Sequence, residues 1–568
     1  MAVARLMVAS PRSDGAQGGL SDEVELYQRT YTTLLRSSGE FALRVLEPSH
    51  RAMGSSLHPL ADAEELDLGA FLYAVRRLPD GICESRVVLL GQELEAFRRA
   101  GMPEVESWRE AEAVARRRRW YDDGDGTLAV LLASGSDVDD LVPTLVAFQI
   151  EWNKLRGRMR ASGELGHEPA TLAGALGGTE DDWARLAEAW GERFTERLAL
   201  VREQKLSLRL RMLGGTQVGY ARLTRRWWAP VQGWLAAEEL AERPIYFVSS
   251  NTHSLANCVT GLATEREADI VQWIEREGPE DLREELRAFR EGRTEGSWEN
   301  FLYFAARDVF ERRRDERRKA ERAAGVMHLR STMALRVPAQ VIPLAKLDAA
   351  RLDPRLGAVD AGALGRSPAV IVNIDYPLGL AAYNILREVA VDVEVLRAVY
   401  VLGKAATLNA DVGDVMLSSV VHDEHSGSTY WLDNAFTVDD IAPDLRFGNG
   451  LDNQRAVTVK STFLQNRSYL DFYYREAFTV VEMEAGPYCN AIYEIADAER
   501  HPVGEAVNFS KLPIDFGIIH YASDTPYTQA RTLGARGLSY YGMDSTYAST
   551  LAILRRILRT EGALAPPG

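Results

Sequence analysis

The chain contains little cysteine for its length. Only Cys83, Cys258 and Cys489 occur among 568 residues. They lie far apart, one must stay unpaired, and none belongs to a CxxC pair, so a disulfide framework is not indicated. A reducing cytoplasm is the expected location.

Long apolar runs and an excess of positive charge are also lacking. No apolar stretch approaches the roughly 20 residues of a membrane-spanning helix, and the opening run is too short and broken for a convincing signal peptide. The net charge of −16 opposes binding to a phosphate backbone, which needs a clustered positive field. The basic run 311–322 is interleaved with acids and is interpreted as a solvated helix face. We therefore expect neither a membrane nor a nucleic acid polymer as partner.

The length predicts more than one domain, because single cores stop growing at roughly 250–300 residues. We predict a flexible N-terminus (1–20), a mainly helical N-terminal domain (21–335), a linker (336–364), an α/β domain (365–560) and a flexible tail (561–568). The proline, glycine and small residues of the linker show no sustained period.

The N-terminal region repeats apolar residues at three- and four-residue steps, which predicts helices. The segment 106–120 is among those interpreted in this way. Two short strand-like runs, 126–135 and 243–251, interrupt the helical texture and leave some α/β character open.

Beyond residue 365, runs of valine, isoleucine and leucine alternate with amphipathic helices. This alternation predicts an α/β fold with a mixed, mostly parallel sheet that helices cover on both faces. Functional loops are then expected at the carboxyl ends of the strands.

The first unusual strand end is "YVLGKAATLNADVGDV" (400–415). Small residues such as Gly403 and Ala405 let backbone N–H groups approach a ligand, and Lys404 and Thr407 could add polar contacts. A tight structural crossover with a surface lysine explains the same pattern equally well.

The second is "VVEMEAGPY", which places Glu482, Met483 and Glu484 at the end of an apolar run. Burying an ionised carboxylate is costly unless donors or a ligand satisfy it, which favours a binding role. If a helix starts at Gly486 or Pro487, its positive N-terminal end would stabilise the acids without any ligand.

The third is "GIIHYASDTPY", where an apolar strand runs into Ser523 and Asp524. In isolation, such an aspartate is more often a helix or turn cap than a catalytic group. Its position after the Glu-Met-Glu segment favours function.

Together, strand–"GKAATLNADVGDV", strand–"VEMEA" and strand–"SDT", in this order, resemble the nucleoside phosphorylase and nucleosidase superfamily over about 365–560. The resemblance implies that Met483 and Glu484 hold a ribose and that Asp524 assists protonation of the leaving base. Glu482 is then structural or assisting. Carboxylates suit this chemistry, because cleavage of an N-glycosidic bond builds positive charge on the sugar and negative charge on the base.

The sequence departs from the superfamily where phosphate would bind. The first strand of the superfamily usually ends in a turn that carries an arginine, but here "VNIDYPLG" offers Asp375. Before "GKAAT", Tyr400 and Val401 stand where phosphorylases tend to carry another phosphate-binding arginine. Asp375 would repel phosphate, although it could position water. Without arginine, phosphate loses its strongest partners. The departures favour hydrolysis, an anion site that uses Lys404, or binding without catalysis.

The run His422, Asp423, Glu424 and His425 invites a metal site. Metal ligands must converge, and one loop rarely supplies them all, so we predict no metal. We also predict no cofactor, with phosphate as an optional co-substrate.

The sequence therefore predicts cleavage of the N-glycosidic bond of a purine-type nucleoside or nucleotide, by hydrolysis rather than phosphorolysis. The alternative is a non-catalytic nucleotide-binding or assembly protein with a degenerate pocket. Because members of the resembling superfamily are commonly oligomers, we expect a homo-oligomer.

Overall fold

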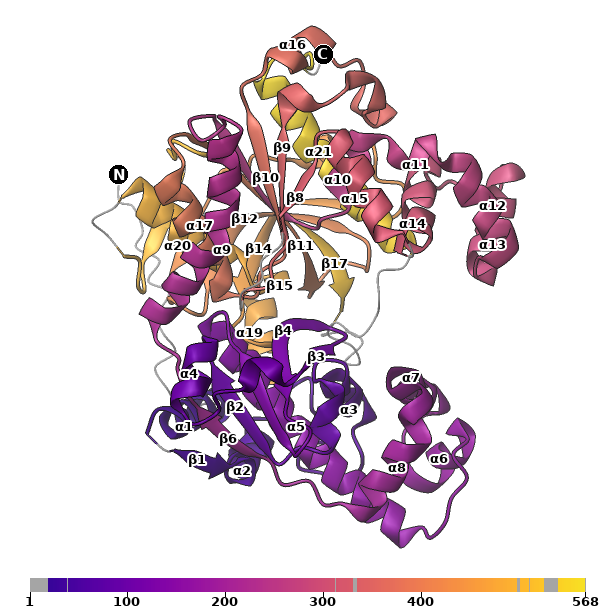
Figure 1. The fold of residues 1–568 in the computed structure, drawn as a ribbon, viewed down its shortest axis with the longest axis vertical. Coiled ribbons are helices and arrows are strands. Elements are labelled where there is room, and N and C mark those ends of the chain that lie inside the picture. Colours follow the sequence, from indigo (N-terminus) through magenta and orange to yellow (C-terminus); the bar gives the residue numbers. More distant parts are fainter. Residues whose placement is uncertain are drawn as a thin grey trace.

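The structure, a computed structural model, describes residues 19–37, 39–311, 313–329, 335–497, 501–509, 511–525 and 540–566. These residues form two β-sheets with helices around them, in an N-terminal part (residues 19–216) and a C-terminal part (217–566) (Figure 1). Most of the predicted flexible N-terminus, 1–20, lies outside the described residues. Within these ranges, no helix combines the length and the apolar character that crossing a membrane requires.

The N-terminal part is built on a six-stranded sheet with the strand order β1-β6-β2-β5-β4-β3. Its strands are β1 Glu40–Ala42, β2 Val87–Gly91, β3 Arg109–Ala113, β4 Arg116–Asp122, β5 Thr127–Leu131 and β6 Arg209–Met212. Its helices are α1 Gly19–Ser37, α2 Glu47–Ala52, α3 Leu68–Val75, α4 Leu94–Arg99, α5 Gly135–Ala161, α6 Pro169–Leu176, α7 Glu180–Trp190 and α8 Phe194–Glu203. The prediction of a mainly helical domain is therefore incomplete, because this part contains a sheet. Of its six strands, the sequence predicts only β5, in the run 126–135.

The segment 106–120 was wrongly predicted to be helical. It contributes to the antiparallel hairpin of β3 and β4. Trp120 is fully buried and pairs with Val130 of β5. This cross-strand packing outweighs the local helical period, because strand preference is mostly a matter of side-chain packing.

The C-terminal part contains an eleven-stranded sheet and most of the helices. Its strands are β7 Ile245–Ser250, β8 Met327–Leu329, β9 Ala339–Pro343, β10 Val370–Asp375, β11 Leu396–Thr407, β12 Val415–Asp423, β13 Thr429–Trp431, β14 Gly450–Thr458, β15 Val480–Glu482, β16 Ala506–Asn508 and β17 Asp515–Asp524. Its helices are α9 Gln217–Ala237, α10 Ser254–Thr260, α11 Leu262–Glu265, α12 Glu267–Glu277, α13 Glu280–Arg290, α14 Trp298–Glu311, α15 Arg314–Ala323, α16 Ala361–Arg366, α17 Leu380–Asp392, α18 Val438–Ile441, α19 Arg467–Arg475, α20 Ala485–Ala496 and α21 Tyr540–Thr560.

This sheet extends across the predicted domain boundary. Strand β7 lies between β10 and β11 and is parallel to both, and β9, inside the predicted linker 336–364, pairs with β10. The predicted flexible tail, 561–568, also begins with packed residues, since Glu561 bonds to Tyr246 and Ala563 is buried. Sheet pairing and core packing join these segments to elements far away in sequence.

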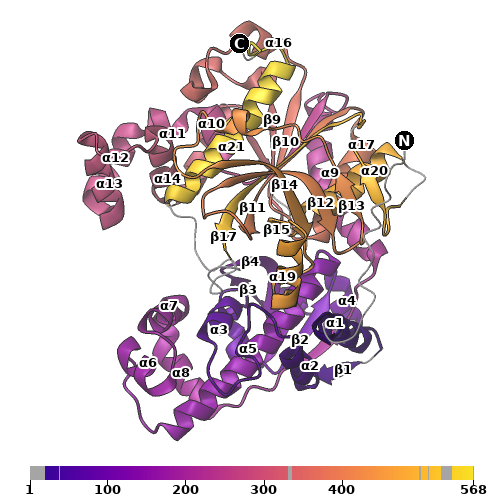
Figure 2. The same ribbon diagram turned by 180° about the vertical axis from the view of Figure 1, so that it is seen from behind.

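Helices cover both faces of the second sheet. Tyr246 and Val248 of β7 belong to one apolar core, whereas Ile245 and Phe247 belong to another, as expected when successive side chains of a strand point to opposite faces. Helices α10, α14 and α21 lie on one side, and α9, α17 and α20 lie on the other (Figures 1 and 2). The sheet is mixed, with parallel and antiparallel pairings among the described strands.

Five strands of this sheet close on one another, because β11 pairs with β15 and β17, and β12 pairs with β14 and β17, while β14 pairs with β15. Ala406 of β11 therefore faces Val481 of β15 on one side and Asp524 of β17 on the other. This closure sets the ends of β15 and β17 beside the same stretch of β11.

Candidate functional site

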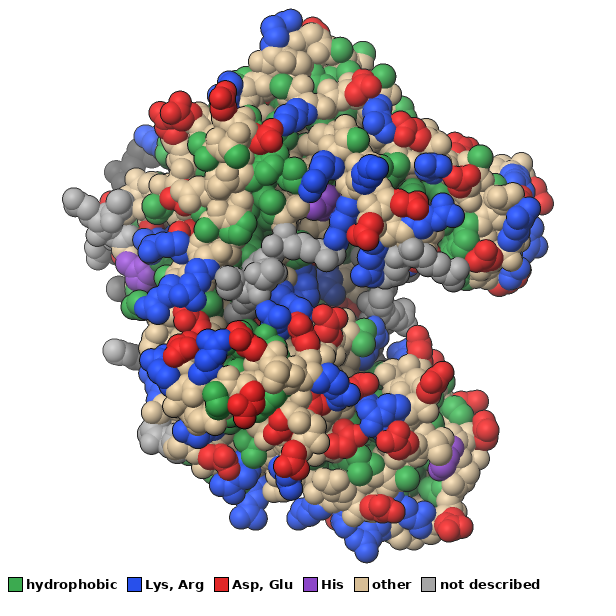
Figure 3. Space-filling view, viewed as in Figure 1, with side chains coloured by type: hydrophobic (Ala, Val, Ile, Leu, Met, Phe, Trp, Pro, Cys, Tyr) green, Lys and Arg blue, Asp and Glu red, His purple; other side chains and the backbone are tan. Residues whose placement is uncertain are grey.

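A cavity of about 470 Å³ lies where the two parts meet. The C-terminal part contributes the ends of β11, β15 and β17, and the N-terminal part contributes β4 and the residues after α3. Figure 3 shows lysine and arginine side chains along the seam between the two parts. Eight residues that the sequence singles out line the cavity: Gly403, Lys404, Ala405, Glu482, Met483, Glu484, Ser523 and Asp524.

The carboxylate of Glu482 is held mainly by the protein itself. Its Oε2 atom accepts hydrogen bonds from the backbone N–H groups of Glu484 (2.6 Å) and Ala485 (2.7 Å), and the hydroxyl of Thr458 bonds to Oε1. These N–H groups belong to the start of α20, whose first turn leaves such donors without helical partners. Burial, together with repulsion by Glu484, raises the pKa of Glu482 to about 8. Glu482 therefore fixes the turn.

Glu484 has fewer partners than Glu482. Strand β15 ends at Glu482, so the two acids do not continue the strand alternation, and Glu484 stands at the N-cap of α20 without capping it. Its Oε1 atom accepts one long bond, 3.4 Å, from the backbone N–H of Gly379. Burial raises the pKa of Glu484 to about 7, against the opposing effects of that N–H and of Arg116. This carboxylate can accept bonds from hydroxyl groups in the cavity.

Asp524 and Lys404 occupy neighbouring strand ends. The hydroxyl of Ser523 donates to Oδ2 of Asp524 (2.9 Å). Lys404 lines the cavity. Desolvation by the surrounding protein lowers the pKa of its ammonium group, whereas the charges of Asp524 and Glu484 act in the opposite direction and raise it. Lys404 thus lies within electrostatic reach of both carboxylates.

Two predicted site residues do not line the cavity. Thr407 is buried, and its hydroxyl accepts a bond from the backbone N–H of Ala410 at 3.0 Å, so it shapes the turn after β11. Asp375 pairs with Arg117 at 3.0 Å and accepts from the N–H of Tyr376. Local partners take up the polar groups of both residues in this structure, and the prediction that they contact substrate stays a prediction.

The sequence interpretation missed the arginines of the N-terminal part. Arg77, Arg116 and Arg118 all line the cavity. The Arg116 guanidinium binds both oxygens of Asp140 (2.8 and 3.0 Å), and Arg118 binds Asp140 (2.5 Å) and Asp137 (2.8 Å). The signal was the run "ARRRRW": read with a strand period of two, it puts Arg116 and Arg118 on one side.

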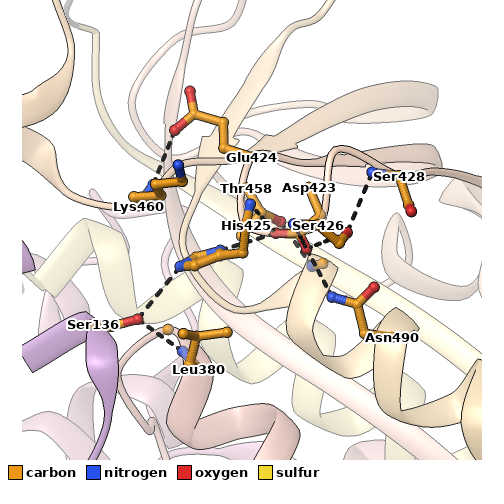
Figure 4. A network of polar contacts seen from close by, with 12 residues as sticks. Ser136, Leu380, Asp423, Glu424, His425, Ser426, Ser428, Thr458, Lys460 and Asn490 are labelled. Carbon is orange, nitrogen blue, oxygen red and sulfur yellow. Dashed lines mark hydrogen bonds and ion pairs between the residues drawn. The ribbon is translucent and has the colours of Figure 1, made fainter. Parts of the chain in front are cut away.

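The run His422 to His425 forms a contact between the two parts rather than a site. His425 Nδ1 lies 2.9 Å from Asp423 Oδ1, and its Nε2 lies 3.4 Å from the hydroxyl of Ser136, the second residue of α5 (Figure 4). Ser136 is fully buried, accepts the N–H of Leu380 at 2.9 Å and does not line the cavity. Ser136, His425 and Asp423 are connected in the order of a serine nucleophile, its base and an acid. Because the Ser136 hydroxyl is buried outside the cavity, a substrate has no access to it. In the part of the chain that the structure describes, no three His, Cys, Asp or Glu side chains are grouped to hold a metal ion.

Solved structures with some likeness to this chain include the 5′-methylthioadenosine/S-adenosylhomocysteine nucleosidases of Neisseria meningitidis, in complex with methylthio-immucillin-A, and of Campylobacter jejuni. They are 13% and 12% identical, cover 44% and 42% of this chain and 95% and 92% of their own, and have TM-scores of 0.28 and 0.27. Uridine phosphorylase of Schistosoma mansoni, in complex with thymidine, is 11% identical, with 43% and 81% covered and a TM-score of 0.27. Scores this low carry no argument about function.

No curated protein matches the sequence. A family of unknown function, DUF6909, matches residues 43–559, which is most of the chain. The chain therefore belongs to this family.

Proposed function

We propose that the protein cleaves the N-glycosidic bond of a purine-type nucleoside or nucleotide. The observation that carries the proposal is that Glu484 and Asp524, forty residues apart, line one cavity. The register explains why: Ala406 of β11 pairs with both Val481 and Asp524. The carboxylates can thus act on different parts of one ligand.

In this proposal Glu484 binds ribose hydroxyls, and Met483 packs against the sugar. Glu484 suits the role because the bond that its Oε1 atom accepts from Gly379 is long, whereas Glu482 is taken up by two short backbone bonds. A carboxylate that grips the hydroxyls also stabilises the positive charge that develops on the sugar. The thioether of Met483 offers soft apolar contact.

Asp524 delivers a proton to the departing base. The bond from the sugar carbon C1′ to the base nitrogen breaks, and the base keeps the electron pair and takes the proton. Water adds its hydroxyl to C1′, and the proton that it releases restores the acid. General acid catalysis of this kind contributes about 10²–10⁴-fold to a rate.

Water is the acceptor that the charges at the strand ends of the C-terminal part favour. Among the described residues between 370 and 525 that line the cavity, Lys404 is the only cation, and the charges of Asp524 and Glu484 act on it. A phosphate dianion beside C1′ would meet the carboxylate of Glu484, and like charges repel. Water carries no such cost.

The test is incubation with adenosine, inosine, guanosine, uridine and their 5′-monophosphates, with and without phosphate, followed by chromatography of free base and sugar products. We expect the products to be the free purine and a sugar that carries no phosphate on C1. Asp524→Asn should lower the rate about 100-fold or more. Asp392→Asn, at an exposed residue at the end of α17, is the matched control and should leave the rate of base release unchanged. Ligand binding without base release by the unaltered protein contradicts the proposal.

A further inference from the structure

Arg77 is a nearly buried cation without a carboxylate partner. Its side chain lines the cavity, and the residue is only 5% exposed. Its Nη1 donates to the backbone oxygen of Tyr73 (3.2 Å), its guanidinium lies 3.3 Å from the centre of the Tyr73 ring, and its Nε has no hydrogen-bond partner. Among the described residues, no carboxylate is within ion-pair distance of it. A buried charge is costly unless it is paired.

The two arginines beside it do not compensate for this charge. Arg116 and Arg118 form ion pairs with Asp137 and Asp140, so the charges of these four side chains balance. Arg77 therefore adds one unbalanced positive charge to this group. Arg118 is almost fully buried, and its Nη1 also has no hydrogen-bond partner. Two guanidinium groups that line the cavity therefore each keep one buried nitrogen without a hydrogen-bond partner.

The backbone holds these arginines in place. Arg77 follows the end of α3, and the N–H of Ala115, next to Arg116, donates to the backbone oxygen of Arg76 (2.7 Å). Burial lowers the pKa of Arg77 to about 10, so the group still carries its charge at neutral pH. Arg116 lowers that pKa further, which puts the two cations within electrostatic reach of one another. The wall is thus preorganised and charged before any ligand arrives.

We propose that Arg77, with Arg116 and Arg118, binds the phosphate group of the ligand. This inference rests on the proposed function and adds the substrate class, a nucleoside 5′-monophosphate. Free inorganic phosphate presents the same chemistry, and the first test distinguishes the two sources. Arginine suits the task, because its planar fork presents several N–H donors to phosphate oxygens. The N-terminal part thereby supplies the cations that the strand ends of the C-terminal part lack. The cavity thus has a basic wall, formed by Arg77, Arg116 and Arg118, for an anion, and an acidic group, Glu484, for hydroxyls.

The first test uses the unaltered full chain and calorimetric titration with adenosine, AMP, inosine, IMP and inorganic phosphate. If the phosphate is part of the substrate, each monophosphate should bind at least about tenfold more tightly than its nucleoside, the difference that one charged hydrogen bond supplies. If the three arginines take free phosphate instead, inorganic phosphate should bind alone and tighten the binding of adenosine or inosine, which would support the phosphate site but contradict hydrolysis by water. Monophosphates that bind no better than nucleosides, with no binding of inorganic phosphate, overturn the proposal.

The second test compares Arg77→Gln and Arg77→Lys with Arg119→Gln as the matched control. Arg119 lies on the same strand as Arg118 but does not line the cavity. Arg77→Gln should lose about tenfold or more of the affinity for the phosphate-bearing ligand while keeping that for the neutral nucleoside. Arg77→Lys should lose less, and Arg119→Gln should behave like the unaltered protein. An equal loss for both ligand types in folded Arg77→Gln would contradict the proposal.

The outcomes separate this inference from the proposed function. Phosphate-dependent binding without release of base refutes the glycosidic cleavage but supports the basic wall. Release of base from neutral nucleosides, unaffected by phosphate or by Arg77→Gln, supports the cleavage and refutes the wall. If Arg77→Gln does not fold, as judged by circular dichroism, the titrations of the unaltered chain still decide.

Discussion

The carboxylate of Glu482 accepts the backbone N–H of Glu484 at 2.6 Å, so the first acid of the pair holds the second in position. Only Met483 separates the two acids in the sequence, but they differ in their partners. Glu482 bonds to the turn and to Thr458, whereas Glu484 receives one long bond from Gly379.

Glu482→Ala should reduce the free energy of unfolding by about 2 kcal/mol or more, because it leaves two buried N–H groups without an acceptor. Glu484→Ala, which removes only a 3.4 Å contact, should cost less than Glu482→Ala. Urea unfolding of the two variants measures the difference. Equal losses would show that Glu482 does not organise the turn.

Stability should fall as pH rises from the ordinary glutamate pKa of 4.5 towards 8. Burial raises the pKa of Glu484 to about 7 and that of Glu482 to about 8, so over this range the folded protein holds protons that the unfolded chain has released. The free energy of unfolding then decreases with pH. Glu484→Gln should flatten the decrease, because it removes one titrating group and its repulsion of Glu482. Urea unfolding at pH 5, 6, 7 and 8 tests this, and an unchanged slope would contradict it.

Gly379→Ala should destabilise the contact between the two parts. Gly379 has φ of +52°, and a Cβ there would lie 2.2 Å from the hydroxyl oxygen of Ser136. A non-glycine residue in such a conformation costs about 1–3 kcal/mol before any clash is counted. Thermal unfolding should show the loss, whereas Gly157→Ala, in open space within α5, should not destabilise. A fully stable Gly379→Ala would count against this packing.

Asp375→Asn should leave turnover nearly unchanged, because Asp375 pairs with Arg117 and does not line the cavity. The pair is partly exposed, so its loss should change the free energy of unfolding by less than about 1 kcal/mol. Steady-state kinetics and urea unfolding check the two statements. A large fall in kcat would place Asp375 in the reaction after all.

The three cysteines should resist thiol reagents in the folded protein. All are buried, and burial raises the pKa of the Cys83 thiol to about 12 and those of Cys258 and Cys489 well above the ordinary value. The thiolate is the reactive form. Titration with a chromogenic disulfide should detect three thiols in denaturant and almost none without it. Rapid reaction in native buffer would contradict the buried placement.

Much of the candidate site could be predicted from local sequence. An apolar run that stops at polar residues marks a strand end, and such ends at 482–484 and 523–524 reach the cavity. Residues 403–405 reach it as well, although β11 continues beyond them to Thr407. The sequence did not predict which residues at these positions are structural and which are free to bind a ligand. Glu482 became a structural group only because the first N–H groups of α20 turn towards it.

The sequence by itself determined the buried strands beyond residue 365, since their apolar composition is a local property that any fold must bury. Only the tertiary structure decided that β7 joins the second sheet, that Ala406 lies between β15 and β17, and that Arg77 and Arg118 line the same cavity as the acids. The physical reason is that strand pairing and charge proximity depend on residues that are distant along the chain. Such contacts leave no periodic mark in the sequence.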